Sequence, residues 1–193
     1  MNRPALLALL ASALLAGCGG DDGDVAAPAA DAEQATVPFD QAFVDAMVPH
    51  HQEAIEMAEA AMESGLTQPD LQRIAEDIIA SQQREIDQML AWREDWFGSR
   101  ELGPVLPEVL GVPESELGME HGSAGEIKAA ADVDAAFAEM MIPHHEGAVA
   151  MAEAAVERAQ HEEVRQLASA IIEAQEREIG IMREHAEGVH HGG

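Results

Sequence analysis

Apolar positions return with a helical period along most of the chain after residue 38. Between residues 40 and 64 they stand at 43, 47, 54, 57, 58 and 61, with Asp40 placed as an N-cap and a glycine as the stop signal. A second periodic stretch begins at Pro69 and extends to about Trp96. Two further stretches open near Asp134 and near Glu162. The pattern therefore predicts four long helices and an all-α fold.

The second pair of helices repeats the first. Met47–Glu63 and Met141–Glu157 share eleven of seventeen residues, and Ile78–Met89 and Ile171–Met182 share seven of twelve. The offset between the copies falls from 94 to 93 residues, which places a one-residue deletion in the turn of the second hairpin, where deletions are tolerated. Two helical hairpins that each expose an apolar face should pack into one four-helix bundle.

The spacing of these stretches predicts the organisation of the chain. We expect a signal peptide at 1–18, an acidic disordered tether at 19–38, the first hairpin at 39–97, a crossover at 98–132, the second hairpin at 133–187 and a short His/Gly tail at 188–193. Pro49 and Pro143 lie inside predicted helices, where the missing N–H should free a carbonyl and bend the axis beside paired histidines.

The first eighteen residues resemble a bacterial lipoprotein signal. Arg3 precedes an apolar run from Ala5 to Ala16, which is too short to span a bilayer. Leu15-Ala16-Gly17-Cys18 resembles the lipobox, in which the cysteine is lipidated and becomes the new N-terminus. We therefore expect an extracytoplasmic protein anchored through Cys18 to a bacterial membrane, at the cell surface or in the periplasm. An ordinary signal peptide with an incidental cysteine is the alternative.

The acidic composition argues against some classes of binding partner. The 37 acidic residues outnumber the 10 basic ones and give a formal net charge of −27, which argues against nucleic acid and anionic lipid head groups as partners. Such a surface attracts cations, although most of these charges need only keep the protein in solution. Cys18 is the only cysteine, so an intrachain disulfide and a CxxC metal site are both excluded.

A helical wheel places polar residues of the repeated motif against the predicted core. With the first helix oriented on Phe43 and Ala61, His50 points inward beside Met47 and Met57. The next residue, His51, falls about 80° away at the edge of the apolar stripe. In the second copy His144 takes the inward place and His145 the edge. On the second helix of each hairpin the apolar face carries a carboxylate and an amide, at Glu85 and Gln82 and again at Glu178 and Gln175.

The joint return of these residues in both copies favours a functional Met/His site over simple core packing. A single methionine or buried histidine most often fills a core. Here Met47, His50, Met57, Glu85 and Met89 converge in one copy and all return in the other, whereas Met62 becomes Val156, as a free core methionine should.

Thioether and imidazole donors together favour a soft metal, with Cu(I) the leading candidate. Methionine is also the durable soft ligand in an exported compartment, where thiols tend to be oxidised. The glutamates would orient imidazole N–H groups or act as additional ligands.

Two other functions remain open at this point. A ferritin-like di-iron oxidase needs paired Glu-x-x-His elements, but Glu53 is replaced by Gly147 and Glu56 by Ala150 in the second copy. An interaction bundle whose histidines and methionines only fill the core would retain no metal. No nucleophile–base pair, phosphate-binding loop or open zinc signature is visible, so the sequence favours a metal buffer or carrier over an enzyme.

The duplicated Met-x-Pro-His-His-x-x-Ala-x-x-Met helices, each followed by Gln-x-x-Glu-Ile-x-x-Met, resemble the CopM-like domain-of-unknown-function family, DUF305. The resemblance covers about residues 39–187 and implies a ferritin-like four-helix bundle. Some members of that family are exported copper-binding proteins implicated in copper tolerance, which implies the same activity here, with an unknown protein partner for metal transfer. The ligands that it implies are Met47, His50, His51, Met57, Met89, Met141, His144, His145, Met151 and Met182.

Two smaller groups could act as accessory sites. Met119 and His121 form a Met/His island in the crossover, and His190 and His191 end the tail. Either could be a mobile metal-collecting arm or an incidental feature of the surface.

Overall fold

The computed structural model describes residues 37–120 and 122–189, with side chains as far as His185. Within these residues every regular element is a helix, which confirms the all-α prediction. The four long helices are α1 (Phe39–Ser64), α2 (Pro69–Phe97), α5 (Val133–Arg158) and α6 (Glu162–Val189). The predicted signal peptide, Cys18 and nearly all of the tether lie outside the described residues, as do His121, His190 and His191.

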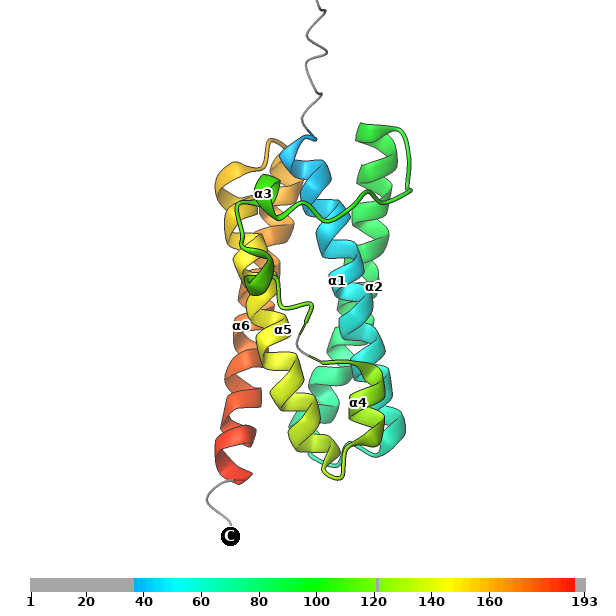
Figure 1. Ribbon diagram of the computed structural model, residues 1–193, viewed down its shortest axis with the longest axis vertical. Helices are drawn as coiled ribbons and strands as arrows, with labels where there is room; N and C mark the ends of the chain where they lie inside the picture. Colours follow the sequence, from blue (N-terminus) through cyan, green and yellow to red (C-terminus); the bar gives the residue numbers. More distant parts are fainter. Residues whose placement is uncertain (1–36, 121, 190–193) are drawn as a thin grey trace, which may run out of the picture. The chain divides into compact units, whose positions relative to one another are not determined.

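The long helices pack as two hairpins side by side. α1 packs against α2 and α5 against α6, while α1 and α5 also pack against each other (Figure 1). Between the hairpins the chain forms α3 (Pro107–Leu110), a 3₁₀ turn η1 (Glu114–Glu116) and α4 (Ala124–Ala129), and crosses in front of α1 and α5. This crossover therefore covers the seam between the two hairpins.

The helix limits follow local signals. Both α1 and α5 continue through their internal prolines. α1 ends where Gly65 takes a φ of 96°, a left-handed conformation that glycine adopts without strain. The first hairpin turn has four residues and the second has three, which is the one-residue difference predicted from the offset between the copies. In the described part of the chain, no helix combines the length and the apolar run needed to cross a bilayer.

Asp40 does not cap its own helix, as the sequence suggested. Pro38 holds the N-cap position of α1. The buried Asp40 carboxylate instead accepts hydrogen bonds from the backbone N–H groups of Gln160 (2.9 Å) and His161 (2.8 Å), the two residues before α6, and from Nδ1 of the His161 ring. We name this contact the Asp40 clasp. The local pattern could not predict it, because the partners lie 120 and 121 positions away along the chain.

Asp134 makes the matching contact from the second hairpin, the Asp134 clasp. Its carboxylate accepts from the backbone N–H groups of Thr67 (2.9 Å) and Gln68 (3.0 Å), the two residues before α2, and from the Thr67 hydroxyl. Burial pushes the pKa of Asp134 upward, but these hydrogen bonds and the nearby His185 outweigh it and leave the pKa below its ordinary value. Each hairpin thus holds the turn of the other.

Two arginines tie the crossover to the bundle. Arg93 on α2 forms a buried ion pair with Asp45 on α1 at 2.6 Å and donates to the Ser99 carbonyl at 2.9 Å. At the end of α5, Arg158 donates to the carbonyl of Leu110, the last residue of α3. The crossover is therefore held at its start and again at α3. Removing Arg93 would leave the Asp45 carboxylate buried without its ion-pair partner, which is strongly destabilising.

Candidate metal-binding site

All four histidines of the repeated motif are buried in the bundle. His50, His51 and His145 have no exposed surface, and His144 is 2% exposed. The expectation that His51 and His145 lie at the rim is therefore wrong. α1 packs against α2, α4 and α5, so more than one of its faces is covered. A wheel with a single apolar stripe underestimates burial in such a helix.

The inner histidines, His50 on α1 and His144 on α5, face each other with ring centroids 3.8 Å apart. Their Nε2 atoms have different neighbours. Nε2 of His50 lies 3.0 Å from the main-chain carbonyl oxygen of Leu117 in the crossover. Nε2 of His144 lies 3.7 Å from a carboxylate oxygen of Glu53 on α1. The two hairpins therefore differ at this point although the histidines themselves are repeated.

Burial and the neighbouring histidines keep His50 neutral. Burial lowers the pKa of His50 well below its ordinary value, and the neighbouring His144, His51 and His145 lower it further against the opposing hydrogen bond to Leu117. Burial also raises the pKa of Glu53. At neutral pH, His50 is therefore a neutral imidazole, the form that binds metal ions.

The outer histidines are held alike in both hairpins. Nε2 of His51 lies 2.8 Å from a Glu85 carboxylate oxygen, and Nε2 of His145 lies 2.6 Å from Glu178. Each glutamate comes from the second helix of the hairpin that carries its histidine, and each is partly buried. The structure therefore brings Glu85 and Glu178 against imidazole nitrogens, an arrangement that fixes ring orientation in metal sites.

In three of the four motif histidines, the second ring nitrogen, Nδ1, is available to bind a ligand. Among the residues that the structure describes, Nδ1 of His50, His51 and His145 is buried and has no hydrogen-bond partner. Carbonyl and carboxylate oxygens only accept hydrogen bonds, so the ring proton lies on Nε2 and Nδ1 keeps the lone pair. A buried acceptor without a partner costs free energy, which makes these atoms good candidates for metal donors.

The six repeated methionines are almost completely buried, each at most 1% exposed, and they form two groups of three. Met47, Met89 and Met151 belong to one apolar cluster. Met57, Met141 and Met182 belong to a second cluster. Each group therefore takes sulfur atoms from both hairpins. On α1 the two histidines stand between Met47 and Met57, so the imidazoles lie between the two clusters.

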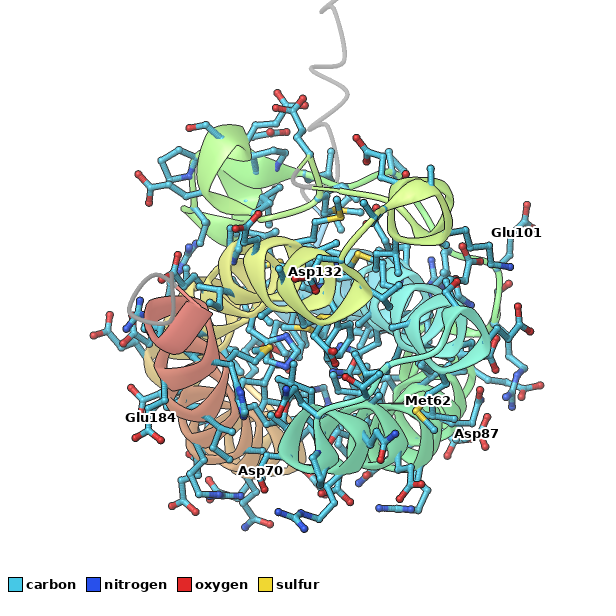
Figure 2. The ribbon with its side chains drawn as sticks, turned by 90° about the horizontal axis from the view of Figure 1, so that it is seen from below. Met62, Asp70, Asp87, Glu101, Asp132 and Glu184 are labelled. Atoms are coloured by element: carbon cyan, nitrogen blue, oxygen red, sulfur yellow. The ribbon has the colours of Figure 1, made fainter. Side chains whose placement is uncertain are left out.

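The view along the bundle in Figure 2 shows sulfur and nitrogen atoms among the side chains between the helices. Met62, by contrast, lies on the outside of the bundle and is 37% exposed (Figure 2). We expected Met62 to be a core residue, and this was wrong. Its replacement by Val156, also 37% exposed, is a change at the surface.

The remaining predicted residues have different places. Gln82 and Gln175 are buried, and their Oε1 atoms find no hydrogen-bond partner among the described residues. Met119 lies in the crossover, where it lines a pocket of about 620 Å³ together with Glu108, Glu114 and Glu120. Within residues 37–120 and 122–185, no three His, Asp or Glu side chains are placed to hold a metal ion by themselves.

Sequence reasoning missed three contributors to the surroundings of the inner histidines. The Leu117 carbonyl belongs to the main chain and has no side-chain signature. Glu53 was considered only as part of a di-iron pattern, and that pattern was set aside because the second copy lacks this glutamate. Gly147 is the position that carried a usable signal, because glycine inside a helix often marks a close approach of another backbone.

A helical bundle whose interior holds repeated imidazoles and thioethers has the donor set of a soft-metal-binding protein. The chain belongs to the DUF305 family, since the family described as "Domain of unknown function (DUF305)" matches residues 40–186. This confirms the resemblance recognised in the duplicated motif. No match was found among curated proteins.

Solved structures extend this relationship. CopM in its Cu(II)-bound form is 34% identical, with 77% of this chain and 96% of that chain covered and a TM-score of 0.65. CopM in its Cu(I)-bound form has the same identity and coverage and a TM-score of 0.63. A DUF305 fragment from Deinococcus radiodurans is 29% identical, with 78% and 97% of the two chains covered and a TM-score of 0.63. The fold is therefore CopM-like, and the matched CopM proteins bind metal.

Proposed function

We propose that this protein binds copper, mainly as Cu(I), and acts as a buffer or carrier in copper tolerance and not as an enzyme. The observation that carries the proposal is the interior layer of four imidazoles between two groups of three methionines. The similarity to CopM in copper-bound forms supports the same function. Copper is cargo in this view, and the protein that receives it is unknown.

The donor set favours the lower oxidation state. Thioether sulfur prefers Cu(I), and a Zn or Fe site rarely uses methionine. Three buried Nδ1 lone pairs stand ready as nitrogen donors. Glu85 and Glu178 would orient His51 and His145, with Gln82 and Gln175 nearby as further polar support. The proposed ligands are the four motif histidines and the six buried methionines.

The bundle architecture suggests how the site arose. We take the two hairpins to be copies of one ancestral hairpin, arranged as a ferritin-like four-helix bundle. The methionine groups support a shared interior, because each draws sulfur atoms from both hairpins. A single hairpin would therefore hold only part of either group.

The decisive experiment is an anaerobic Cu(I) titration against a chromophoric competing chelator. We expect the wild-type protein to compete for Cu(I), and the double variant His50→Ala/His144→Ala to lose at least about tenfold in affinity or lose stoichiometry. The variant His185→Ala is the matched control, since His185 lines a separate small pocket with Leu71 and Ala138. Unchanged binding in the double variant would refute the proposed ligands.

Analysis of the wild-type protein also distinguishes our proposal from the alternative of a di-metal oxidase. That alternative predicts two irons in the protein as isolated and consumption of oxygen, whereas our proposal predicts copper retention after growth in copper. Elemental analysis together with an oxygen electrode measures both. Retention of no metal would favour an interaction bundle.

Export and anchoring are a separate part of the proposal. The lipobox-like Leu15-Ala16-Gly17-Cys18 supports a lipid anchor at a bacterial membrane, outside the cytoplasm. Replacing Cys18→Ser should move the protein from the membrane fraction to the soluble fraction. A membrane-bound Cys18→Ser protein would contradict the anchor without affecting the copper proposal.

A further inference from the structure

Leu117 and Gly118 form a short strap that lies against α5 (Figure 1 shows the crossover in front of this helix). A Cβ atom on Gly147 would stand 2.1 Å from the Leu117 carbonyl oxygen, far inside contact distance. A Cβ atom on Gly118 would stand 2.7 Å from the Pro143 carbonyl oxygen. Glycine at both positions therefore lets the two backbones meet.

This strap occupies a place that a side chain fills in the other hairpin. Gly147 is the counterpart of Glu53, and Glu53 is the residue beside Nε2 of His144. Where the second hairpin lacks that glutamate, the strap enters and places the Leu117 carbonyl beside Nε2 of His50. The acceptor for His50 is thus a fixed main-chain group, supplied from outside both hairpins.

We propose that the Leu117 carbonyl, seated by Gly147 and Gly118, is a positioning group that locks His50 in the Nε2–H tautomer and so presents Nδ1 as its metal-binding atom. A carbonyl oxygen accepts and never donates, so the hydrogen bond requires the proton on Nε2. Glu85 and Glu178 impose the same tautomer on His51 and His145 through carboxylates. The use of Nδ1 for metal rests on the copper proposal, whereas the tautomer does not.

Loss of the strap should therefore act on one histidine. The other two histidines keep their carboxylate partners, which come from α2 and α6 and do not depend on the crossover. A group that only stabilised the fold would change all of the histidine signals together or none of them.

The test is two-bond ¹H–¹⁵N correlation NMR of the metal-free, ¹⁵N-labelled protein, which distinguishes Nε2–H from Nδ1–H imidazoles. We expect wild-type His50, His51 and His145 to show the Nε2–H pattern. In Gly147→Ala, whose added Cβ displaces the strap, His50 should lose the fixed pattern while the other two keep it. Gly180→Ala is the matched control, since Gly180 also lies in a long helix but a Cβ there would meet nothing within 4 Å.

Two results would overturn the proposal. The first is an Nδ1–H pattern for His50 in the wild-type protein, a measurement that needs no variant to fold. The second is an unchanged His50 pattern in Gly147→Ala when the Leu117 and Gly118 amide shifts show that the strap has moved. A companion Cu(I) titration should show about a tenfold loss of affinity in Gly147→Ala only. Absence of Cu(I) binding by the wild-type protein would refute the proposed function and leave the tautomer result standing.

Discussion

The two hairpins hold their outer histidines in the same way and their inner histidines in different ways. His51 and His145 each meet a glutamate from the second helix of their own hairpin. His50 meets a crossover carbonyl, whereas His144 faces the Glu53 carboxylate. Repetition of sequence therefore preserves contacts within a hairpin, while the single crossover makes the centre of the bundle asymmetric.

The largest test of this comparison is to make the second hairpin like the first. Gly147→Glu should destabilise the protein by about 3 kcal/mol or more, because even its Cβ overlaps the strap and the carboxylate would be buried. The reverse change, Glu53→Gly, should cost only about 1 kcal/mol through lower helix propensity. Urea unfolding followed by circular dichroism measures both.

Ala150→Glu is the control for this pair, since Ala150 is a second position where the first hairpin has glutamate, at Glu56, and it is only partly buried. We expect a cost below about 1 kcal/mol there. A Gly147→Glu protein as stable as the wild type would mean that the strap is not seated as described.

The clasps provide a second comparison, with a pH dependence. Asp40→Asn should cost about 2 kcal/mol and Asp134→Asn about 1 kcal/mol, because Asp40 is the more buried carboxylate and also accepts from the His161 ring. The pKa of Asp134 lies below its ordinary value of 3.8 in the folded protein. Its contribution is therefore complete above about pH 4 and disappears as the pH falls through the lower folded value.

Thermal unfolding of the wild type and Asp134→Asn between pH 2 and pH 7 checks this sign. The two stability curves should converge on the acid side. A difference that grew as the pH fell would show that the Asp134 clasp is not held by an ionised carboxylate.

Symmetry of the outer histidines predicts equal effects from their glutamates. Glu85→Gln and Glu178→Gln should each weaken Cu(I) binding about tenfold, because each removes a charged acceptor from an imidazole N–H. The chelator titration described above measures the loss. Glu59→Gln and Glu153→Gln are matched controls, since this glutamate is also repeated but exposed in both copies. Unequal losses for Glu85 and Glu178 would break the symmetry of the outer pair.

The smallest effect should come from the carboxylate found in one hairpin only. Glu53→Gln removes a negative charge near His144, and electrostatic attraction doubles with the charge of the ion. We expect roughly a threefold loss of Cu(I) affinity and roughly a tenfold loss for Cu(II), given partial screening by solvent. Parallel titrations under anaerobic and aerobic conditions compare the two ions. An equal loss for both would argue against a charge effect.

Much of the fold could be predicted from the sequence because the signals are local and occur twice. Helical periodicity and the stop at Gly65 are each read within a few residues, and the shortened second turn follows from aligning the two copies. The helices begin and end close to the expected positions. The destination of Asp40 could not be predicted in this way. Periodicity places it in the first turn of α1 but contains no information about a partner 120 residues away.

The candidate site was predictable in its residues more than in its geometry. The repeated Met and His positions proved to be buried. Glu85, which contacts His51, is partly buried. Burial of His51 and His145 was missed because the number of neighbours around a helix depends on the crossover and the other hairpin. The Leu117 carbonyl was beyond reach for a different reason, since every residue has such a group and only tertiary packing selects one.

Tension applied to the chain ahead of Phe39 would reach α6 through the Asp40 clasp. Asp40 lies one residue inside α1, and its buried carboxylate grips the first residues before α6. A force on the N-terminal end is therefore transmitted to the start of α6 as well as to α1. The hydrogen bonds of Asp40 must break before α1 can separate from the bundle. A protein held to a surface by that end, as proposed, would resist mechanical unfolding as one body.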